Sequence, residues 1–530
     1  MAKHQVLVGG QWRDADSDAW FQASDPAAGD VLPDHYPVSR WSDCEEALNA
    51  AVDAFRVMQT MPREQISLFL EAFADRLEGC SEEICEMAHR ETALPVPTRL
   101  AGGELPRTCG QLRQAAEACR TSSWAQPTID TATNIRSCLA GMGPVAVFGP
   151  NNFPLAFGSI SGGDFAAAIA AGNPVIAKAN SMHPGTTRIL AREAKLAADE
   201  TGMPPAIVQM VYRIDHADGE RLARDPRLAA IGYTGARSAG LKLKGAADAV
   251  GKPIYLELSS VNPTIILPGA LAERASDIAS EFTGSCLMGT GQFCTNPGLV
   301  ILCRGPQMDS FVESLVTQFE AAPVGTLFSR SGQEGLAAAV QTLVAAGAEV
   351  LCGGQPGGGE GFSYGNTLLR VTAEHFLAAP EALQTEAFGN ASLLVIADSV
   401  DQAIDVVSHI EGNLTGCIYS DTQGGDDVAY DRMAPVLRQK VGRLLNDKMP
   451  TGVAVSPAMN HGGPFPATGH PSVTAVGMPG AVIRFGMLQC YDNVRPERLP
   501  DLLRDENPTR VWRSVDGVWT QAPVPPKSTE

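Results

Sequence analysis

Short apolar runs alternate with helix-like runs through the middle of the chain. PVAVFG (144–149), NPVIAKAN (173–180), AIVQMVY (206–212) and LAAIGYTG (228–235) have the composition of buried strands. Between them, GGDFAAAIAAG, PGTTRILAREAKLAADET and GERLARDP are typical of helices. Strands that alternate with helices predict βαβ units and a parallel sheet that is covered on both faces.

A second alternating series begins near residue 255. YLELSSVNPTIIL, NPGLVILC and the start of ASLLVIADSVDQAIDVVSHI indicate strands, and ASDIASEFTGSC and MDSFVESLVTQFEAA indicate helices. The first roughly 120 residues are expected to be helical, as in residues 42–58 with Ser42 as the N-cap. The last ten or so residues are rich in proline and polar side chains, and we expect disorder there.

Length and composition narrow the class of protein. A chain of 530 residues is too long for one hydrophobic core, so two or three domains are expected. The formal net charge of -19 argues against a nucleic-acid partner. The N-terminus lacks the pattern of a signal peptide, and no apolar run reaches the roughly 18 to 20 residues of a membrane span. A cytoplasmic protein without a membrane partner is therefore predicted.

Four separated segments carry side chains suited to chemistry. Asn152 follows a predicted strand, Lys178 and Glu257 end two others, and Cys294 lies in the glycine-rich GTGQFCTNPG. Ligands of open α/β sheets bind beyond the carboxyl ends of strands, where three of these four residues fall. Each residue alone also fits a structural role, and Cys294 could be a nucleophile, a metal ligand or part of a loop. The twelve cysteines show no metal-binding spacing, and no third ligand candidate lies near Cys294 in the sequence, so no metal is expected.

Taken together, the four residue types suit the oxidation of an aldehyde. That reaction needs a thiolate to attack the carbonyl and amide donors to hold the oxyanion. It also needs a carboxylate to activate water against the thioester, and a dinucleotide to accept the hydride.

Seven segments in order make the chain resemble the aldehyde dehydrogenase superfamily. They are GPNNFP (149–154), AKANS (177–181), GYTGARSAG (232–240), LELSS (256–260), GQFC (291–294), TEAFGN (385–390) and GNLTGCIYS (412–420). The resemblance implies an α/β, aldehyde dehydrogenase-like fold with two Rossmann-related domains, parallel sheets and a β-arm for oligomerisation. It further implies a cofactor-binding domain over 1–258 with an arm near 121–141, and a catalytic domain over 259–463. Residues 464–530 would return to the cofactor domain and supply an oligomerisation strand and a tail.

The resemblance also implies catalytic roles. Cys294 would be the nucleophile, Asn152 and the Cys294 backbone N–H would form the oxyanion hole, and Glu257 would activate water. Lys178 would also count among the catalytic residues, although it lies in the cofactor-binding part of the site. The substrate pocket would include Asn151, where the family has Trp, and also Phe153, Phe157, Phe293 and Thr295.

Cofactor residues follow from the same resemblance. Lys178, Ser181 and Arg213 would bind the adenosine ribose, and Thr234, Gly235 and Ala236 the pyrophosphate at a helix N-terminus. Glu386 would bind the nicotinamide ribose, with Phe388 against the ring. Ser181 stands where the K-P-S-E motif has Glu, so NADP is expected to be preferred, with NAD as the weaker alternative.

The departures from the family motifs resemble one branch of it. This branch holds 2-oxoglutarate semialdehyde (2,5-dioxopentanoate) dehydrogenases and NADP-dependent fatty aldehyde dehydrogenases. The leading expectation is a homo-oligomeric enzyme, dimer or tetramer, that oxidises 2-oxoglutarate semialdehyde. A broad or long-chain aliphatic aldehyde dehydrogenase and a catalytically silent homologue are the alternatives. Transfer of the acyl group to coenzyme A is disfavoured because Glu257 is present to activate water.

Overall fold

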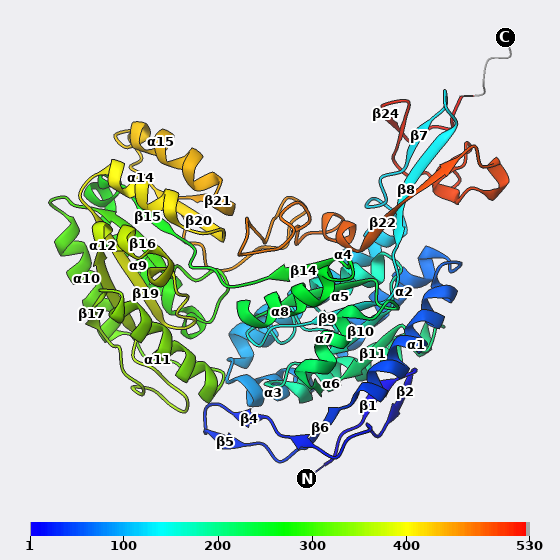
Figure 1. Cartoon of the computed structure of the whole chain (residues 1–530), viewed down its shortest axis with the longest axis horizontal. Helices are drawn as coiled ribbons and strands as arrows, with labels where there is room; N and C mark the ends of the chain where they lie inside the picture. Colours follow the sequence, from blue (N-terminus) through cyan, green and yellow to red (C-terminus); the bar gives the residue numbers. More distant parts are fainter. Residues whose placement is uncertain (1, 526–530) are drawn as a thin grey trace.

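The computed structural model describes residues 2–525 in two α/β lobes and a projecting sheet (Figure 1). Part of the tail for which disorder was expected lies outside the described residues. Within residues 2–525, no helix combines the length and apolarity that crossing a bilayer demands.

The first lobe contains a seven-stranded sheet in the order β14-β13-β9-β10-β11-β1-β2. Its parallel strands are β9 (Val145–Phe148), β10 (Val175–Lys178), β11 (Val208–Val211), β13 (Ala230–Thr234) and β14 (Ile254–Glu257). The antiparallel pair β1 (Val6–Val8) and β2 (Gln11–Arg13) extends the edge beyond β11. Chain order runs outward from β9 in both directions, as in a doubly wound sheet, so the order reverses between β9 and β13.

The helices of this lobe lie where the apolar periodicity predicts helices, except that the N-terminal segment forms strands. They are α1 (Trp41–Met58), α2 (Arg63–Gly79), α3 (Ser81–Thr92), α4 (Leu105–Thr121), α5 (Gly163–Ala170), α6 (Pro184–Glu200), α7 (His216–Arg224) and α8 (Arg237–Asp248). A π-helical segment, Val96–Glu104, leads into α4.

The expectation of a helical N-terminus was wrong for residues 2–39. They form β1, β2 and four further short strands, which are β3 (Trp20–Phe21), β4 (Ser24–Asp25), β5 (Asp30–Val31) and β6 (Tyr36–Ser39). Ser42 is also not the N-cap of α1. The helix begins at Trp41, and the Ser42 hydroxyl donates to Oδ2 of Asp16 at 2.6 Å. Strands of two to four residues are too short to show the alternation that identifies longer ones.

The second lobe contains another seven-stranded sheet, in the order β17-β18-β19-β16-β15-β20-β21. Its strands are β15 (Thr264–Ile266), β16 (Leu299–Cys303), β17 (Glu349–Cys352), β18 (Thr367–Thr372), β19 (Ala391–Ala397), β20 (Asn413–Tyr419) and β21 (Val441–Asn446). All pairs are parallel except the edge pair β17–β18. The helices are α9 (Pro268–Leu287), α10 (Met308–Ala321), α11 (Arg330–Ala345), α12 (Ala373–Ala378), α13 (Pro380–Leu383), α14 (Val400–His409) and α15 (Asp427–Arg438).

Strand β16 shows why this lobe is covered on both faces. Leu299 and Ile301 pack into one core with side chains of α11, α14 and α15, whereas Val300 and Leu302 pack with α9 and α10. A strand buried on both faces reads as a continuous apolar run, as LVILC does. The α/β expectation is therefore confirmed.

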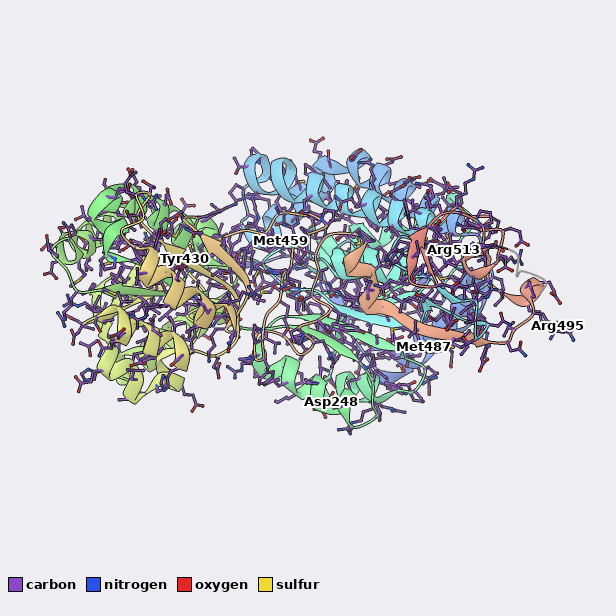
Figure 2. The ribbon with its side chains drawn as sticks, turned by 90° about the horizontal axis from the view of Figure 1, so that it is seen from above. Asp248, Tyr430, Met459, Met487, Arg495 and Arg513 are labelled. Atoms are coloured by element: carbon purple, nitrogen blue, oxygen red, sulfur yellow. The ribbon has the colours of Figure 1, made fainter. Side chains whose placement is uncertain are left out.

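A five-stranded sheet projects from the first lobe and gathers distant parts of the chain (Figure 1). Its order is β22 (Gly486–Asp492), β8 (Ile135–Gly141), β7 (Thr128–Asp130), β23 (Arg513–Val515) and β24 (Val518–Thr520). We call these strands the arm sheet. The segment between β21 and the arm sheet crosses from the second lobe back to the first, and Met459 in it lies between the lobes (Figure 2).

Candidate active site

The site lies at the point where the strand order of the first sheet reverses. Open α/β sheets form a crevice at this point, outside the carboxyl ends of the strands. A cavity of about 260 Å³ is lined there by the segments that follow β9, β13 and β14, together with residues of the second lobe. Nine of the predicted site residues line this cavity, namely Asn151, Asn152, Thr234, Gly235, Ala236, Glu257, Cys294, Glu386 and Phe388.

A tight loop before β16 presents Cys294. Gly289, Thr290 and Gly291 have φ values of 56°, 58° and 67°, in the left-handed region that favours glycine. A Cβ atom on Gly291 would lie 2.0 Å from the backbone oxygen of Gly389, so a larger residue cannot occupy that position. The chain therefore bends tightly just before the cysteine.

The Asn262 side chain donates two hydrogen bonds to the backbone of the same loop. Its Nδ2 atom donates to the backbone oxygen of Cys294 at 2.9 Å and to that of Asn296 at 2.8 Å. Asn262 is fully buried and has a φ of 48°, a backbone conformation that asparagine tolerates better than most residues. Sequence reasoning missed this contact because Asn262 lies in ELSSVNP, where it reads as a turn residue.

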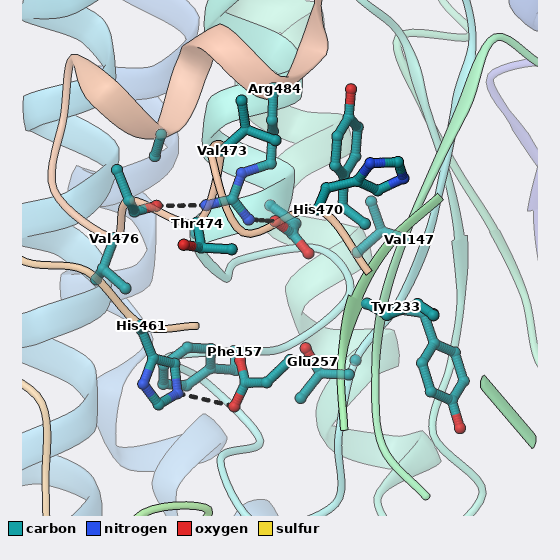
Figure 3. Close-up of a pocket in the computed structure, with 18 of the residues that line it drawn as sticks. Val147, Phe157, Tyr233, Glu257, His461, His470, Val473, Thr474, Val476 and Arg484 are labelled. Atoms are coloured by element: carbon teal, nitrogen blue, oxygen red, sulfur yellow. Dashed lines mark hydrogen bonds and ion pairs between the residues drawn. The ribbon is translucent and has the colours of Figure 1, made fainter. Parts of the chain in front are cut away.

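Cys294, His461 and Glu257 form one hydrogen-bonded group. The His461 Nε2 atom lies 3.3 Å from Sγ of Cys294 and 2.7 Å from Oε1 of Glu257. The bond between His461 and Glu257 is drawn in Figure 3. Nδ1 of His461 is buried and has no partner among residues 2–525, so the tautomer with hydrogen on Nε2 is the one whose N–H finds an acceptor.

His461 corrects the premise that no third ligand candidate accompanies Cys294. Ligand atoms of Glu257, Cys294 and His461 all lie within 4.8 Å of one another. However, two ligands of a tetrahedral zinc ion at about 2.0–2.1 Å would be separated by roughly 3.3 Å. The 2.7 Å between Nε2 and Oε1 is a hydrogen-bond distance, so the geometry is that of a proton-sharing group.

Electrostatics keep the Cys294 thiol protonated at rest. Burial, followed by the negative charge of Glu257, raises its pKa well above the usual value. Arg107 contributes a smaller effect in the opposite direction. To become a thiolate, Cys294 needs a group that accepts its proton and a group that donates a hydrogen bond to the sulfur. Glu257 can accept the proton, and His461 can donate the hydrogen bond.

Asn152 is fixed for donation into the site. Its side-chain amide donates to the backbone oxygen of Gln292 at 3.0 Å, which leaves its second N–H available. The Arg99 guanidinium donates to the Asn152 backbone oxygen at 2.9 Å and to Glu104 at 3.0 Å. No hydrogen bond within residues 2–525 uses the backbone N–H of Cys294. Two donors are thus free beside the thiol.

Glu257 also borders a second, smaller cavity of about 50 Å³ (Figure 3). This cavity is also lined by His461, by Phe157 and by the ion pair of Asp164 with Arg484, whose atoms are 2.7 Å apart. Glu257 thus lines both cavities.

Aromatic side chains surround the site as expected. Phe153, Phe157 and Phe293 form one cluster, with edge-to-face contacts at 5.1 and 5.3 Å. Asn151 lines the 260 Å³ cavity, so the amide that replaces the family's Trp does border the site. Thr295 is buried, and its hydroxyl accepts from the Gly452 N–H at 2.9 Å. It therefore anchors the segment around residue 452, a contact that its expected place in the pocket did not include.

Three residues at the start of α8 fit a phosphate group. Thr234, Gly235 and Ala236 line the cavity where the helix begins. Ala236 is the N-cap and supplies no side-chain hydrogen bond, so the first N–H groups of α8 lack an internal capping group. A helix N-terminus with free N–H groups favours an anion.

Glu386 and Phe388 approach the cavity from the second lobe. Burial raises the pKa of Glu386 to about 7, against the opposing effect of hydrogen bonds from Ser259 and Ser260. The Ser260 hydroxyl donates to Asn262 at 2.8 Å and accepts from the Leu414 N–H at 3.0 Å. The two serines that replace the family's glycines thus support Glu386 and the Asn262 turn.

Lys178 and Arg213 place two positive charges near one another. Lys178 ends β10 in register with Val211, two residues before Arg213. Burial, followed by the charge of Arg213, lowers the pKa of Lys178 to about 8. Within residues 2–525 neither Lys178 nor Arg213 forms an ion pair. Ser181 lies in the turn that follows β10.

Comparison with known proteins agrees with this arrangement. Residues 12–434 match the aldehyde dehydrogenase family. The chain is 39% identical to alpha-ketoglutaric semialdehyde dehydrogenase 2 of Azospirillum brasilense, with 97% of this chain and 98% of that protein covered. It is 36% identical to alpha-ketoglutaric semialdehyde dehydrogenase of Acinetobacter baylyi, with 93% and 95% covered. A crystal structure of PnpE in complex with nicotinamide adenine dinucleotide has the same fold, with a TM-score of 0.79, 21% identity, and 94% of this chain and 100% of that one covered. The chain therefore belongs to the aldehyde dehydrogenase family.

Proposed function

We propose that the protein oxidises 2-oxoglutarate semialdehyde to 2-oxoglutarate with NADP preferred to NAD. The observation that carries the proposal is the hydrogen-bonded group of Cys294, His461 and Glu257, beside the free amide of Asn152. The substrate follows from the two relatives above, both of which bear the name of this activity. Alpha-ketoglutaric semialdehyde and 2-oxoglutarate semialdehyde are one compound.

The first step forms a carbon–sulfur bond. Glu257 takes the proton of the Cys294 thiol, and the Nε2–H of His461, which donated to the charged carboxylate, donates to the thiolate as it forms. The sulfur then attacks the aldehyde carbon to give a thiohemiacetal. Because His461 contacts both groups through one hydrogen, it stabilises whichever of them carries the negative charge.

The oxyanion forms where the two free donors lie. The Asn152 amide and the Cys294 backbone N–H supply the hydrogen bonds, and one such donor contributes about 3–4 kcal/mol to lowering the barrier. Arg99 holds the backbone of Asn152, so the donor needs little reorganisation as charge develops.

The cofactor fits the residues around the cavity. The uncapped start of α8 suits its pyrophosphate, and the carboxylate of Glu386 suits a ribose diol. A nicotinamide held by these residues would supply the hydride acceptor, and a thioester would then remain on Cys294. Glu257 passes the thiol proton to solvent and then removes a proton from a water molecule. The hydroxide attacks the thioester, the thiolate of Cys294 leaves, and the acid is released.

Preference for NADP is supported by charge. Lys178 and Arg213 face the same region without a carboxylate partner among residues 2–525, and Ser181 offers a hydroxyl where the family motif has Glu. A 2′-phosphate would offset the repulsion between the two cations. A ribose diol would not.

A homo-oligomer is supported by the arm sheet. Several of its large apolar side chains are exposed in the single chain, namely Met487, Leu488, Val518 and Trp519. Exposed apolar side chains clustered on one projecting sheet are typical of a protein interface. We propose that the arm sheet packs against another copy of the chain.

The alternative substrates and the silent homologue are separated by one experiment. The purified protein is assayed with 2-oxoglutarate semialdehyde, hexanal and dodecanal, each with NADP and NAD, and kcat/KM is compared. We expect the highest value for 2-oxoglutarate semialdehyde with NADP. A higher value for dodecanal would favour the fatty aldehyde alternative, and the absence of turnover with all three would favour a silent homologue.

A further inference from the structure

An unpaired guanidinium lies one aromatic ring away from the catalytic group. Arg107 is in the first turn of α4, and its guanidinium carbon lies 4.9 Å from the centre of the Phe157 ring. That ring is 5.9 Å from the ring of His461, which contacts Cys294. Arg107 therefore packs on the aromatic side chains beside the catalytic group.

The donors of Arg107 are mostly unused. Nη1 donates to the backbone oxygen of Val453 at 2.6 Å, whereas Nε and Nη2 are covered from solvent and have no partner. Within residues 2–525, no carboxylate forms an ion pair with Arg107. A buried charged donor without an acceptor is costly, and the cost is removed if a ligand supplies the acceptor.

Two other arginines near the site use more of their donors within the chain. Arg99 is paired with Glu104 at 3.0 Å and lies between the rings of Phe153 and Phe293. Arg443 donates to the backbone oxygens of Pro450 and Gly452. Arg107 is thus the one of these three with two buried guanidinium nitrogens that have no partner within residues 2–525.

We propose that Arg107 binds the carboxylate of the aldehyde substrate and makes the enzyme selective for oxo acids over neutral aldehydes. The proposal rests on the proposed function and names the residue that recognises its substrate class. Two N–H groups of a guanidinium match the two oxygens of a carboxylate. Stacking on Phe157 and the Val453 contact fix the plane of the group, so little side-chain freedom is lost on binding.

Electrostatics agree with this geometry. Burial lowers the pKa of Arg107, against the opposing charges of Cys294, Glu104 and Glu257, in a site that holds the cation away from water. A substrate carboxylate would restore a close partner to the cation. Its positive charge would also remain near Cys294 when the sulfur is ionised.

The test compares two aldehydes that differ chiefly in one carboxylate, 5-oxopentanoate and pentanal, in the wild type, Arg107→Met and Arg107→Lys. Arg113→Met is the matched control, because Arg113 is in the same helix and pairs with Asp75 and Glu78 at the surface. We expect Arg107→Met to lower kcat/KM for 5-oxopentanoate by roughly 10- to 100-fold, chiefly through KM. Pentanal should change less than about threefold, because it makes no charged hydrogen bond that the variant could lose. Arg107→Lys should lose less, and Arg113→Met should match the wild type.

Equal losses on both aldehydes would overturn the proposal, because a residue that only tethers Val453 and supports Phe157 serves both substrates alike. So would no loss on either. Calorimetric binding of glutarate and 2-oxoglutarate to the same variants separates this proposal from the proposed function. If the wild type oxidises neither aldehyde but binds these dianions through Arg107, the function is wrong and the subsite stands. If Arg107→Met binds these dianions as the wild type does, the subsite is wrong. Arg107→Lys serves for the same comparison if the Met variant does not fold.

Discussion

The Nε2 atom of His461 lies 3.3 Å from Sγ of Cys294, although 167 residues separate the two in the chain. Cys294 reaches this position through left-handed backbone at Gly289 and Gly291, and His461 reaches it from the irregular segment that returns to the first lobe. The same imidazole nitrogen contacts Glu257. The proposed nucleophile Cys294 and the proposed base Glu257 therefore share one hydrogen-bond donor.

His461 should control the reactivity of the Cys294 thiol. Without its N–H, the thiolate loses a hydrogen bond to a charged group, so the pKa of Cys294 should rise further. We expect His461→Leu to slow alkylation of Cys294 by iodoacetamide near neutral pH by roughly 10- to 100-fold. The rising limb of the pH–rate profile should move to higher pH, and His461→Gln, which keeps an N–H donor, should restore part of the rate.

Peptide mass spectrometry provides an internal reference for this experiment. Cys490 is exposed on β22, far from the site in the fold, and its alkylation should be the same in all variants. Unchanged alkylation of Cys294 in His461→Leu would show that the histidine only fills space.

Cys294 and Cys286 should respond differently to removal of the thiol. We expect Cys294→Ala to retain less than about a hundredth of the wild-type rate, since the covalent step needs the sulfur, while cofactor binding stays intact. Cys286 is buried in α9, where burial raises its pKa to about 12. Cys286→Ala should keep near wild-type turnover, and a comparable loss there would argue against Cys294 as the nucleophile.

Affinity for NADP should fall with rising pH. Lys178 has a pKa lowered to about 8, so its ammonium is charged below that pH and becomes neutral above it. Binding of a 2′-phosphate favours the charged form, whereas NAD lacks that phosphate. The Kd for NADP, measured by fluorescence between about pH 6.5 and 9.5, should therefore rise more steeply than the Kd for NAD.

Two substitutions check the same pocket. Arg213→Ala should weaken NADP more than NAD and move the pH break upward, because the charge of Arg213 helps to lower the pKa of Lys178. Ser181→Glu would place a carboxylate near the phosphate, and two unit charges about 4 Å apart repel by roughly 4 kcal/mol at an effective dielectric near 20. Equal weakening of both cofactors by Arg213→Ala, or a wild type that favours NAD, contradicts this assignment.

The arm sheet should hold subunits together. Leu488 on β22 is 65% exposed in the single chain, so Leu488→Glu should weaken an interface that buries it. Val428 on α15 is 75% exposed, and Val428→Glu provides a control of the same kind in the second lobe. By sedimentation at micromolar concentration we expect an oligomer for the wild type and for the control. A wild type at the monomer mass of 55.8 kDa would rule the interface out.

The sequence indicated the two α/β series because each strand there is a buried apolar run flanked by glycine, asparagine or proline. It could not indicate β3, β4 and β5, because strands of two residues have no alternation to detect. Asn152, Glu257 and Cys294 were found through ordered motifs next to strands. The fold then brings them to one cavity, as expected from the position of strand ends in a doubly wound sheet.

His461 and Arg107 could not be found in the same way. His461 follows Asn460 and precedes Gly462 in a long irregular segment, and its one signal is a histidine beside a Gly-Gly pair. Arg107 lies in a helix with several other arginines, and periodicity cannot distinguish a buried, unpaired guanidinium from Arg113 or Arg120, which form surface ion pairs. Both depend on how the two lobes and the connecting segment pack.

The central claim is that oxidation proceeds through an acyl group bound to Cys294, which Glu257 hydrolyses with water. The most direct measurement mixes Glu257→Gln with 2-oxoglutarate semialdehyde and NADP in a stopped-flow instrument, then analyses the quenched protein by mass spectrometry. We predict a burst of NADPH close to one per active site, slow turnover afterwards, and an acyl adduct on the Cys294 peptide. A folded, cofactor-binding Glu257→Gln that shows neither burst nor adduct, or that turns over as fast as the wild type, would contradict the account.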